Sequence, residues 1–202
     1  FKPKKIICLA LSLVLCASAL IISLNVKADM VTVSKTVNPQ LEFAKIKADY
    51  ITVDGGKIAS IGKCDLDGID LGGNEIYPGL IDIHIHGCMG YDTMEGGLEQ
   101  MSDRLLSKRT TAWYPTTMTM SEEDIIKAAH ANTRIEGGAN IPGFHMEGPF
   151  INVKYKGAQN EKYVIPPTME LFNKCKSIKL VTIAPEVEGS MEFIRECPAV
   201  VC

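Results

Sequence analysis

Residues 77–90 read YPGLIDIHIHGCMG, and this stretch decides the fold that we expect for the chain. Apolar and polar residues alternate in it, which predicts a β-strand because successive side chains of a strand point to opposite faces. One face carries isoleucines, and the other carries Asp82, His84 and His86. Histidines two positions apart in a strand lie about 7 Å apart at Cα, so both can reach one metal ion.

Two interpretations of this strand compete. A half-buried strand with its polar face in water needs no chemistry at all. Histidine is an uncommon choice for such a face, however, and it is the commonest metal ligand in proteins. The pair of His84 and His86 therefore favours a metal site, which also needs an acidic partner elsewhere in the chain.

An acidic candidate occurs in GFHMEGPFINVKYKGAQN, residues 143–160. His145 and Glu147 share one face of a predicted strand, which Gly148-Pro149 ends directly after Glu147. The alternative is a glutamate that only caps the strand or stabilises the loop. In parallel α/β barrels, active sites form at the carboxyl ends of the strands, so we expect Glu147 to join the two histidines.

From residue 82 onward the pattern alternates between strands and helices. Strands are expected within residues 110–120, 141–151, 179–186 and 198–202, and helices within residues 121–135, 168–178 and 190–197. Ser121 is the predicted N-cap of the first helix. This alternation predicts parallel βα units in an α/β fold. His130 lies in a helix, far from the strand ends, and is expected to be a surface or packing residue.

The segments before residue 80 differ in character. Residues 48–63, ADYITVDGGKIASIGK, predict a β-hairpin with its turn at residues 54–56, and residues 68–79 add a third short apolar run. Residues 1–28 have three lysines followed by an uncharged apolar run, which is typical of a signal peptide or a membrane anchor. Because the first residue is Phe, we expect the true start of the protein to lie upstream.

The composition narrows the class of protein. The 202 residues are 46% hydrophobic and 22% charged, an ordinary balance for a globular domain. A net charge of -3 without a basic block argues against a nucleic-acid partner. The seven cysteines form no C-x-x-C pair and no disulfide framework. Cys88 follows the histidine pair closely, but we expect it to be a packing residue rather than a ligand.

Four motifs carry a resemblance to a known family. These are PGLIDIHIHG at residues 78–87, YPTTMT at 114–119, residues 143–160 above, and VTIAPE at 181–186. Together they resemble the N-acetylglucosamine-6-phosphate deacetylase family of the amidohydrolase superfamily, from about residue 50 to residue 202. The resemblance implies hydrolysis of the acetamide of N-acetyl-D-glucosamine 6-phosphate to D-glucosamine 6-phosphate and acetate. It implies an incomplete (β/α)8 TIM-type barrel over residues 78–202, preceded by a small β-sandwich segment over residues 29–77.

The resemblance also implies roles for individual residues. Glu147 is the metal ligand found across the family, and His84 with His86 binds a second ion in members that keep the pair. The cofactor is then a divalent metal, zinc or iron(II), as one or two ions. Ala158 and Gln159 fall where the family contacts the sugar, with Gln159 in place of a His seen in some relatives. His145 is expected to orient Glu147.

The family's remaining metal ligands, its general acid/base Asp and its phosphate-binding residues lie on later strands. We therefore expect the chain to be the N-terminal part of a longer product and inactive by itself. The resemblance also implies a homodimer when the protein is full length. The family is cytoplasmic, whereas residues 1–28 resemble an export signal, so the localisation stays open. Two alternatives remain: another amidohydrolase, dihydroorotase-like or deaminase-like, and a non-catalytic fragment tethered to a membrane.

Overall fold

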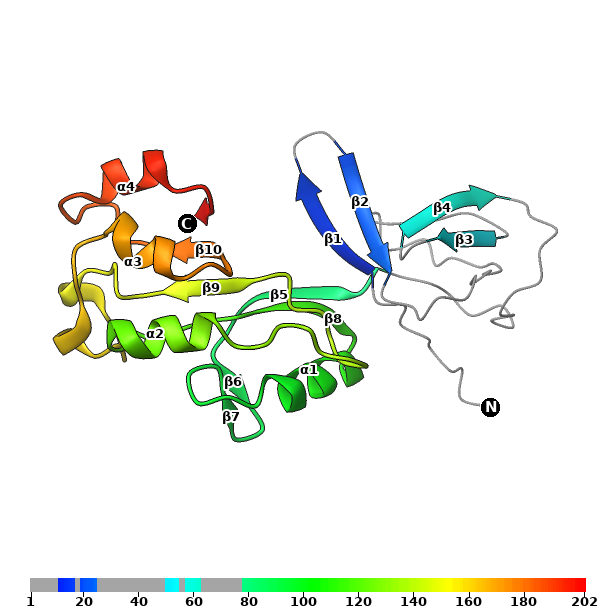
Figure 1. Ribbon diagram of the computed structural model, residues 1–202, viewed down its shortest axis with the longest axis horizontal. Helices are drawn as coiled ribbons and strands as arrows, with labels where there is room; N and C mark the ends of the chain where they lie inside the picture. Colours follow the sequence, from blue (N-terminus) through cyan, green and yellow to red (C-terminus); the bar gives the residue numbers. More distant parts are fainter. Residues whose placement is uncertain (1–10, 17–18, 25–49, 55–56, 63–77) are drawn as a thin grey trace. The chain divides into compact units, whose positions relative to one another are not determined.

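The computed structural model describes residues 11–16, 19–24, 50–54, 57–62 and 78–202. Contacts divide the chain into two units (Figure 1). The first comprises Phe1–Ile81 and Leu106–Ala112, and the second comprises Asp82–Leu105 and Trp113–Cys202. Most of the third apolar run, residues 68–77, lies outside the described residues.

The first unit holds a four-stranded sheet in the order β1-β2-β4-β3. Its strands are β1 (Leu11–Cys16), β2 (Ala19–Leu24), β3 (Tyr50–Asp54) and β4 (Lys57–Gly62). Strands β3 and β4 pair antiparallel, and the hydroxyls of Thr52 and Ser60 lie 2.5 Å apart across the pair. The hairpin predicted for residues 48–63 is thereby confirmed, although its central turn residues, 55–56, lie outside the described residues.

The apolar N-terminal run forms part of this sheet. Strands β1 and β2 pair antiparallel with Leu15 opposite Leu20, and Ser23 of β2 pairs with Lys57 of β4. Within the described ranges, no helix has both the length and the apolar character needed to cross a bilayer. The rest of residues 1–28 lies outside the described residues, so the signal peptide or anchor stays a prediction.

The parallel strands are β5 (Leu80–Ile85), β8 (Thr110–Pro115), β9 (Phe144–Glu147), β10 (Ile178–Thr182) and β11 (Val200–Val201). Strands β9, β10 and β11 form a parallel sheet, and β5 pairs with β8. A parallel bridge between Thr116 and His145 joins the end of β8 to β9. Neighbouring strands therefore follow the order of the chain, and the predicted α/β fold with parallel strands is confirmed.

A helix follows each of the first four parallel strands. These are α1 (Leu98–Ser107), α2 (Glu122–Ala129), α3 (Met169–Lys174) and α4 (Ser190–Glu196). The Ser121 hydroxyl accepts a hydrogen bond from the Asp124 N–H, which confirms the predicted N-cap of α2. Helix α1 was not among the predicted elements, although its buried Leu98, Met101 and Leu105 recur at helical spacing.

Short elements complete the loops beyond the strand ends. Strands β6 (Gly87–Cys88) and β7 (Tyr91–Asp92) form a small antiparallel pair after β5. Two turns of 3-10 helix, η1 (Val153–Tyr155) and η2 (Glu161–Tyr163), lie in the loop after β9. Asn152 and Asn160 cap them by accepting backbone N–H bonds through their side chains.

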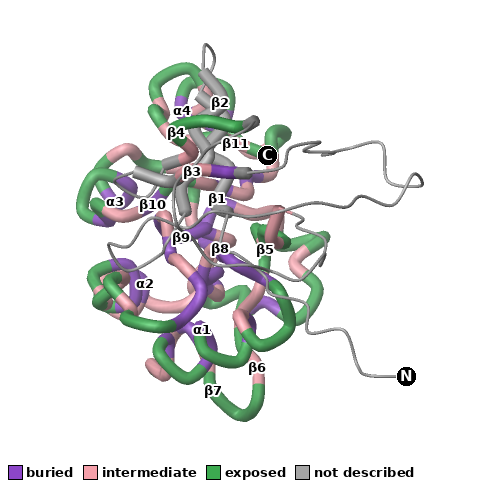
Figure 2. The backbone as a smooth tube through the Cα atoms, turned by 90° about the vertical axis from the view of Figure 1, so that its right-hand side faces the viewer, coloured by how far each residue is buried: buried purple, intermediate pink, exposed green. Residues whose placement is uncertain are grey.

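The core of the second unit lies between the strands and the helices, where buried residues follow β8 and β9 (Figure 2). Trp113 of β8 is fully buried, and its indole N–H donates to the Ser102 hydroxyl of α1 at 2.9 Å. The rings of Phe150 and Phe172 both pack edge-on against Phe193 of α4. These contacts hold the helices against the strands that carry the site.

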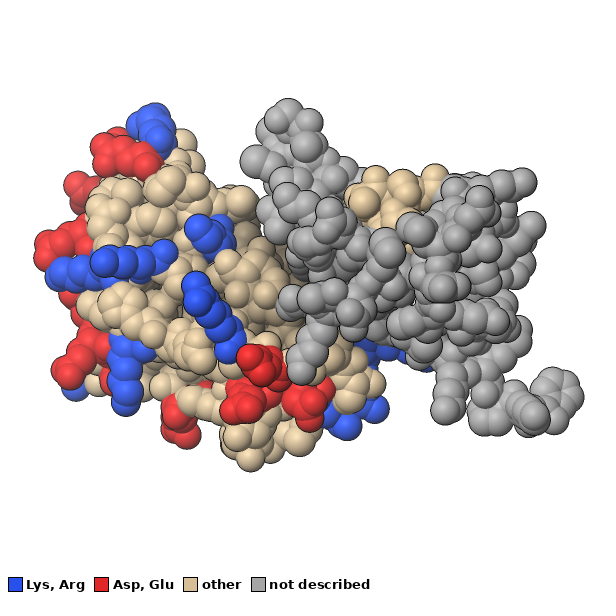
Figure 3. Space-filling view, turned by 45° about the vertical axis from the view of Figure 1, so that its right-hand side comes forward, with Lys and Arg blue, Asp and Glu red and all other residues tan. Residues whose placement is uncertain are grey.

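Charged side chains of both signs lie on the surface of the second unit (Figure 3). Lys174 of α3 pairs with Glu170 at 2.8 Å and with Glu122 of α2 at 3.8 Å. The His130 ring at the end of α2 contacts the Lys174 carbonyl oxygen through Nε2 at 2.9 Å. His130 therefore links two helices, as expected of a surface or packing residue.

Candidate metal centre

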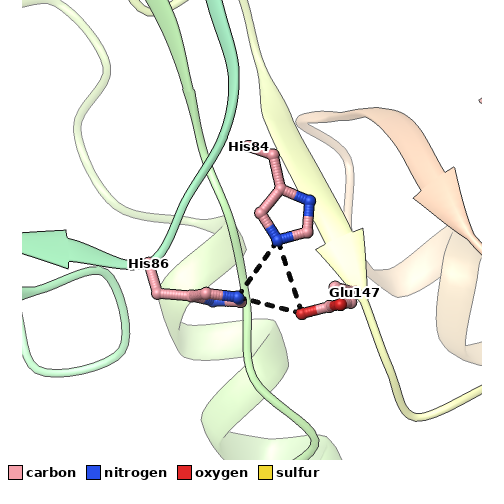
Figure 4. Close-up of side chains that lie close together, drawn as sticks. All are labelled: His84, His86 and Glu147. Atoms are coloured by element: carbon pink, nitrogen blue, oxygen red, sulfur yellow. Dashed lines mark hydrogen bonds and ion pairs between the residues drawn. The ribbon is translucent and has the colours of Figure 1, made fainter.

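Three side chains converge at the carboxyl ends of β5 and β9 (Figure 4). His84 belongs to β5, His86 directly follows that strand, and Glu147 is the last residue of β9. The Nε2 atoms of His84 and His86 lie 3.2 Å apart. Oε2 of Glu147 lies 2.9 Å from Nε2 of His86 and 3.7 Å from Nε2 of His84. The structure thus brings together the three residues that the sequence predicted as metal ligands.

His86 is held in a defined tautomer. Its Nδ1 lies 3.2 Å from the Thr116 carbonyl oxygen, which can only accept, so Nδ1 carries the hydrogen. Nε2 therefore faces Glu147 with its lone pair or with a second proton. The hydrogen bond with Glu147 is the main cause that raises the pKa of His86. A proton on Nε2 of His86 therefore lies between the imidazole and the Glu147 carboxylate. A metal ion bound by both groups would occupy the same position.

Glu147 is fixed through its backbone and its carboxylate. Its N–H donates to the Thr117 hydroxyl at 3.2 Å, and that hydroxyl lies 3.3 Å from the Glu147 carbonyl oxygen. The hydrogen bond with His86 is the main cause that lowers the pKa of the Glu147 carboxyl, and electrostatic attraction to His84 and His86 lowers it further. The ionised form, which is the form that binds a cation, is therefore favoured.

His145 lies beside the group without belonging to it. Its Nδ1 donates to the Ile83 carbonyl oxygen at 2.7 Å, and its Nε2 lies 2.8 Å from the Thr182 hydroxyl. Burial lowers the pKa of His145, so its ring is neutral and Nε2 accepts from Thr182. Both ring nitrogens are engaged, and no hydrogen bond to Glu147 is found among the described residues. The ring instead packs edge-on against His84, with centroids 5.0 Å apart.

Two other polar residues of the opening stretch lie outside the group. Asp82 accepts the His84 N–H through Oδ1 at 3.0 Å and thereby stabilises the local backbone. Burial raises the pKa of the Cys88 thiol, and Cys88 is not among the ligand atoms that lie close together in the described residues. Among the described residues, the metal-ligand group comprises only His84, His86 and Glu147.

The geometry of these ligands fits a transition-metal ion. Ligands about 2.0–2.2 Å from a tetrahedral ion lie about 3.3–3.6 Å from one another, and the three distances here run from 2.9 to 3.7 Å. Two imidazoles and one carboxylate form a donor set that zinc accepts, and iron(II) binds the same set. The structure therefore supports a divalent metal site without fixing the metal.

The two residues expected at the sugar lie in the loop between η1 and η2. Ala158 is exposed. Gln159 is buried and donates from Nε2 to Oε2 of Glu147 at 2.9 Å, while its Oε1 accepts the Thr119 N–H at 2.7 Å. The loop thus reaches the metal ligands themselves, a contact that sequence reasoning did not anticipate.

Sequence reasoning also missed the threonines that support the ligands. Thr116 holds His86, Thr117 holds the backbone of Glu147, and Thr119 holds Gln159. All three follow the buried strand β8 directly, within the YPTTMT motif. The sequence signal that could have revealed them is the run of polar residues at the end of β8, the strand between β5 and β9.

Comparison with known proteins identifies relatives of the chain. No protein-family model matches the chain. A curated N-acetylglucosamine-6-phosphate deacetylase from Bacillus subtilis is 34% identical over 179 residues, which cover 74% of this chain and 43% of that protein. This chain is a homologue of N-acetylglucosamine-6-phosphate deacetylases. It spans less than half the length of the curated relatives it matches.

Solved structures of N-acetylglucosamine-6-phosphate deacetylases share the fold. The enzyme from Thermotoga maritima matches with a TM-score of 0.59 at 26% identity, over 76% of this chain and 44% of that chain. A Mycobacterium smegmatis deacetylase variant, solved in complex with N-acetyl-D-glucosamine-6-phosphate, matches with a TM-score of 0.60. It is 21% identical over 75% of this chain and 44% of that chain, and this likeness concerns the fold alone.

Proposed function

We propose that this chain supplies part of the active site of an enzyme that hydrolyses the acetamide of N-acetyl-D-glucosamine 6-phosphate. The products are D-glucosamine 6-phosphate and acetate, a step of amino-sugar catabolism. The convergence of His84, His86 and Glu147 at the ends of β5 and β9 carries the proposal. The name shared by the relatives supplies the choice of substrate.

The chemistry suits this group of residues. Hydrolysis forms a bond from the water oxygen to the acetyl carbon, breaks the carbon–nitrogen bond and leaves the proton on the amine. An amide is a poor electrophile, and a bound divalent ion polarises its carbonyl and lowers the pKa of water. Thr116 keeps Nε2 of His86 directed at the ion position, and Thr117 holds Glu147 at the end of β9.

The fold proposed for the complete protein follows the family. Strands β5, β8, β9, β10 and β11 are then the first strands of a (β/α)8 barrel over residues 78–202, and residues 29–77 belong to a small β-sandwich. Further ligands, the general acid/base Asp and the phosphate site come from later strands. We propose one or two ions of zinc or iron(II), and a homodimer as the complete protein.

The substrate is proposed to lie against the loop after β9. Ala158 is exposed there and free to contact the sugar. Gln159 follows it directly, so the same loop joins the substrate region to Glu147. A phosphorylated amino sugar is the expected small-molecule partner.

Acetate release from N-acetyl-D-glucosamine 6-phosphate by the complete protein, with added zinc or iron(II), tests the proposal. Turnover that disappears in Glu147→Ala supports it, and residues 29–202 alone should show none. No acetate release from a folded, metal-loaded complete protein would contradict it. Release of ammonia from an aminopurine, or cyclisation of N-carbamoyl-aspartate, would instead indicate a deaminase-like or a dihydroorotase-like enzyme.

A further inference from the structure

The side-chain amide of Gln159 joins separate segments of the site, and its Nε2 also lies 3.8 Å from the sulfur of Met118. Its side-chain Nε2 lies 2.9 Å from Oε2 of Glu147, and its Oε1 lies 2.7 Å from the backbone nitrogen of Thr119. The residue is only 8% exposed. Its own carbonyl oxygen accepts from Nζ of Lys156 at 3.2 Å, which holds the loop backbone as well.

The partners of this amide fix its orientation. The Thr119 N–H can only donate, so the amide oxygen must face it. The NH₂ group then faces Glu147, whose carboxylate can only accept when ionised. A flipped amide would place two donors against each other and two acceptors against each other, so only one orientation satisfies both partners.

The bond to Glu147 is compatible with metal binding by the same carboxylate. A carboxylate oxygen has two lone pairs, so Oε2 can accept from Gln159 and still face Nε2 of His84 and of His86. Hydrogen-bond donors to a metal-binding carboxylate fix its direction and are part of how proteins tune metal affinity.

We propose that Gln159 is a positioning residue that holds the carboxylate of Glu147 in place for the metal ion. The side chain acts through Glu147 and Thr119, the groups that its amide nitrogen and oxygen contact. This inference rests on the proposed metal site, and it gives Gln159 a different role from the sugar contact that the family resemblance implies.

Zinc affinity of the complete protein, measured by competition with a chromogenic chelator, tests the role. Gln159→Met keeps the length of the side chain and removes the hydrogen bonds of the amide to Glu147, Thr119 and Met118. We expect zinc binding about 10- to 100-fold weaker, the range typical when such partners are removed. The KM for the sugar, measured at saturating zinc, should stay unchanged. Gln100→Met, an exposed position of α1, is the matched control and should leave both quantities unchanged.

Gln159→His is the second variant, since imidazole can accept from Thr119 with one nitrogen and donate to Glu147 with the other. It should bind zinc more tightly than Gln159→Met. If the Met variant does not fold, near-normal zinc affinity in the folded His variant supports the role, and a loss above about tenfold overturns it.

Two further results separate the possible failures. A Gln159→Met protein that binds zinc normally but has a raised KM would overturn the positioning role and restore the sugar contact. An unsubstituted protein that binds no zinc would overturn the metal site itself.

Discussion

Nε2 of His86 and Oε2 of Glu147 lie 2.9 Å apart, and each group shifts the pKa of the other. Their hydrogen bond is the largest cause that raises the pKa of His86 above 6.5, and the largest that lowers the pKa of Glu147 below 4.5. In the metal-free protein the proton and the carboxylate therefore stabilise each other. A metal ion must displace that proton before it binds Nε2.

The first prediction is a pH dependence of zinc affinity. Affinity should rise about tenfold per pH unit below the raised pKa of His86 and level off above it, because one proton is released. Chelator competition over about pH 5.5–8.5 measures this, with His86→Asn as the control that should lose most of the slope. An affinity independent of pH below neutrality would contradict the prediction.

The pair of His86 and Glu147 also predicts how the stability of the metal-free protein depends on pH. The contribution of His86 is fully present below pH 6.5 and is lost as pH rises through its raised pKa. The contribution of Glu147 is present above pH 4.5 and is lost as pH falls through its lowered pKa. The free energy of unfolding in urea should therefore include the contribution of the pair only between the lowered pKa of Glu147 and the raised pKa of His86. Glu147→Gln should remove that contribution.

The second prediction ranks the ligands in the complete protein. Glu147→Ala should remove tight metal binding and nearly all activity, since by family resemblance Glu147 holds the ion that activates water. His84→Asn combined with His86→Asn should remove at most one metal equivalent and leave measurable turnover. Metal content by mass spectrometry and kcat/KM decide this. A dead double variant beside an active Glu147→Ala would reverse the ranking.

The third prediction concerns the buried ring of His145. His145→Phe keeps an aromatic ring but leaves the Ile83 carbonyl and the Thr182 hydroxyl without that partner, so we expect a loss of about 1–3 kcal/mol. Thr182→Val should cost less, and the double variant should cost less than the sum of the two. Urea unfolding of the four proteins measures the coupling. Strict additivity would show that the contact between the two side chains contributes nothing.

The fourth prediction compares two glycines with positive φ. Gly148 has φ +66° and Gly157 has φ +58°, so alanine at either position is strained by about 1–2 kcal/mol. Only at Gly148 would the added Cβ also collide with Thr119, whereas nothing lies within 4 Å at Gly157. Gly148→Ala should therefore weaken zinc binding as well as stability, and Gly157→Ala should affect stability alone. Equal zinc affinities would show that displacing Thr119 leaves the ligands undisturbed.

The fifth prediction addresses the N-terminus. Residues 1–35 fused to a reporter should direct it to the membrane or beyond it, because three lysines precede an uncharged apolar run. Cell fractionation measures this, with a fusion in which Leu13 and Val14 are both replaced by Asp as the control. A reporter found entirely in the soluble cytoplasmic fraction would contradict the prediction. Residues 11–24 would then serve only as strands β1 and β2 of the four-stranded sheet and not as a targeting signal.

The ligands could be predicted because the features that place them are local. A period of two predicts that His84, in β5, and His86, directly after it, point to the same side. Gly148-Pro149 ends β9 directly after Glu147. The N-cap of α2 is local in the same way. Each of these features can be derived from a few consecutive residues.

The supporting contacts could not be predicted because they depend on the register of distant strands. Thr116 meets His86 only because β8 lies beside β5, and Gln159 meets Thr119 only because the loop after β9 folds back. The sequence also favoured a contact from His145 to Glu147, since the two share a face. In the structure both nitrogens of His145 are used by other strands.

Strand order along the chain has a consequence for biosynthesis. The residues that hold His84, His86 and Glu147 in the described structure lie no further along the chain than Thr182 at the end of β10. Because a polypeptide emerges from the ribosome with its N-terminal part first, these ligands and the residues that hold them emerge before any segment beyond β10. Zinc captured at that stage would bind the nascent folded state and shift its equilibrium away from the unfolded chain.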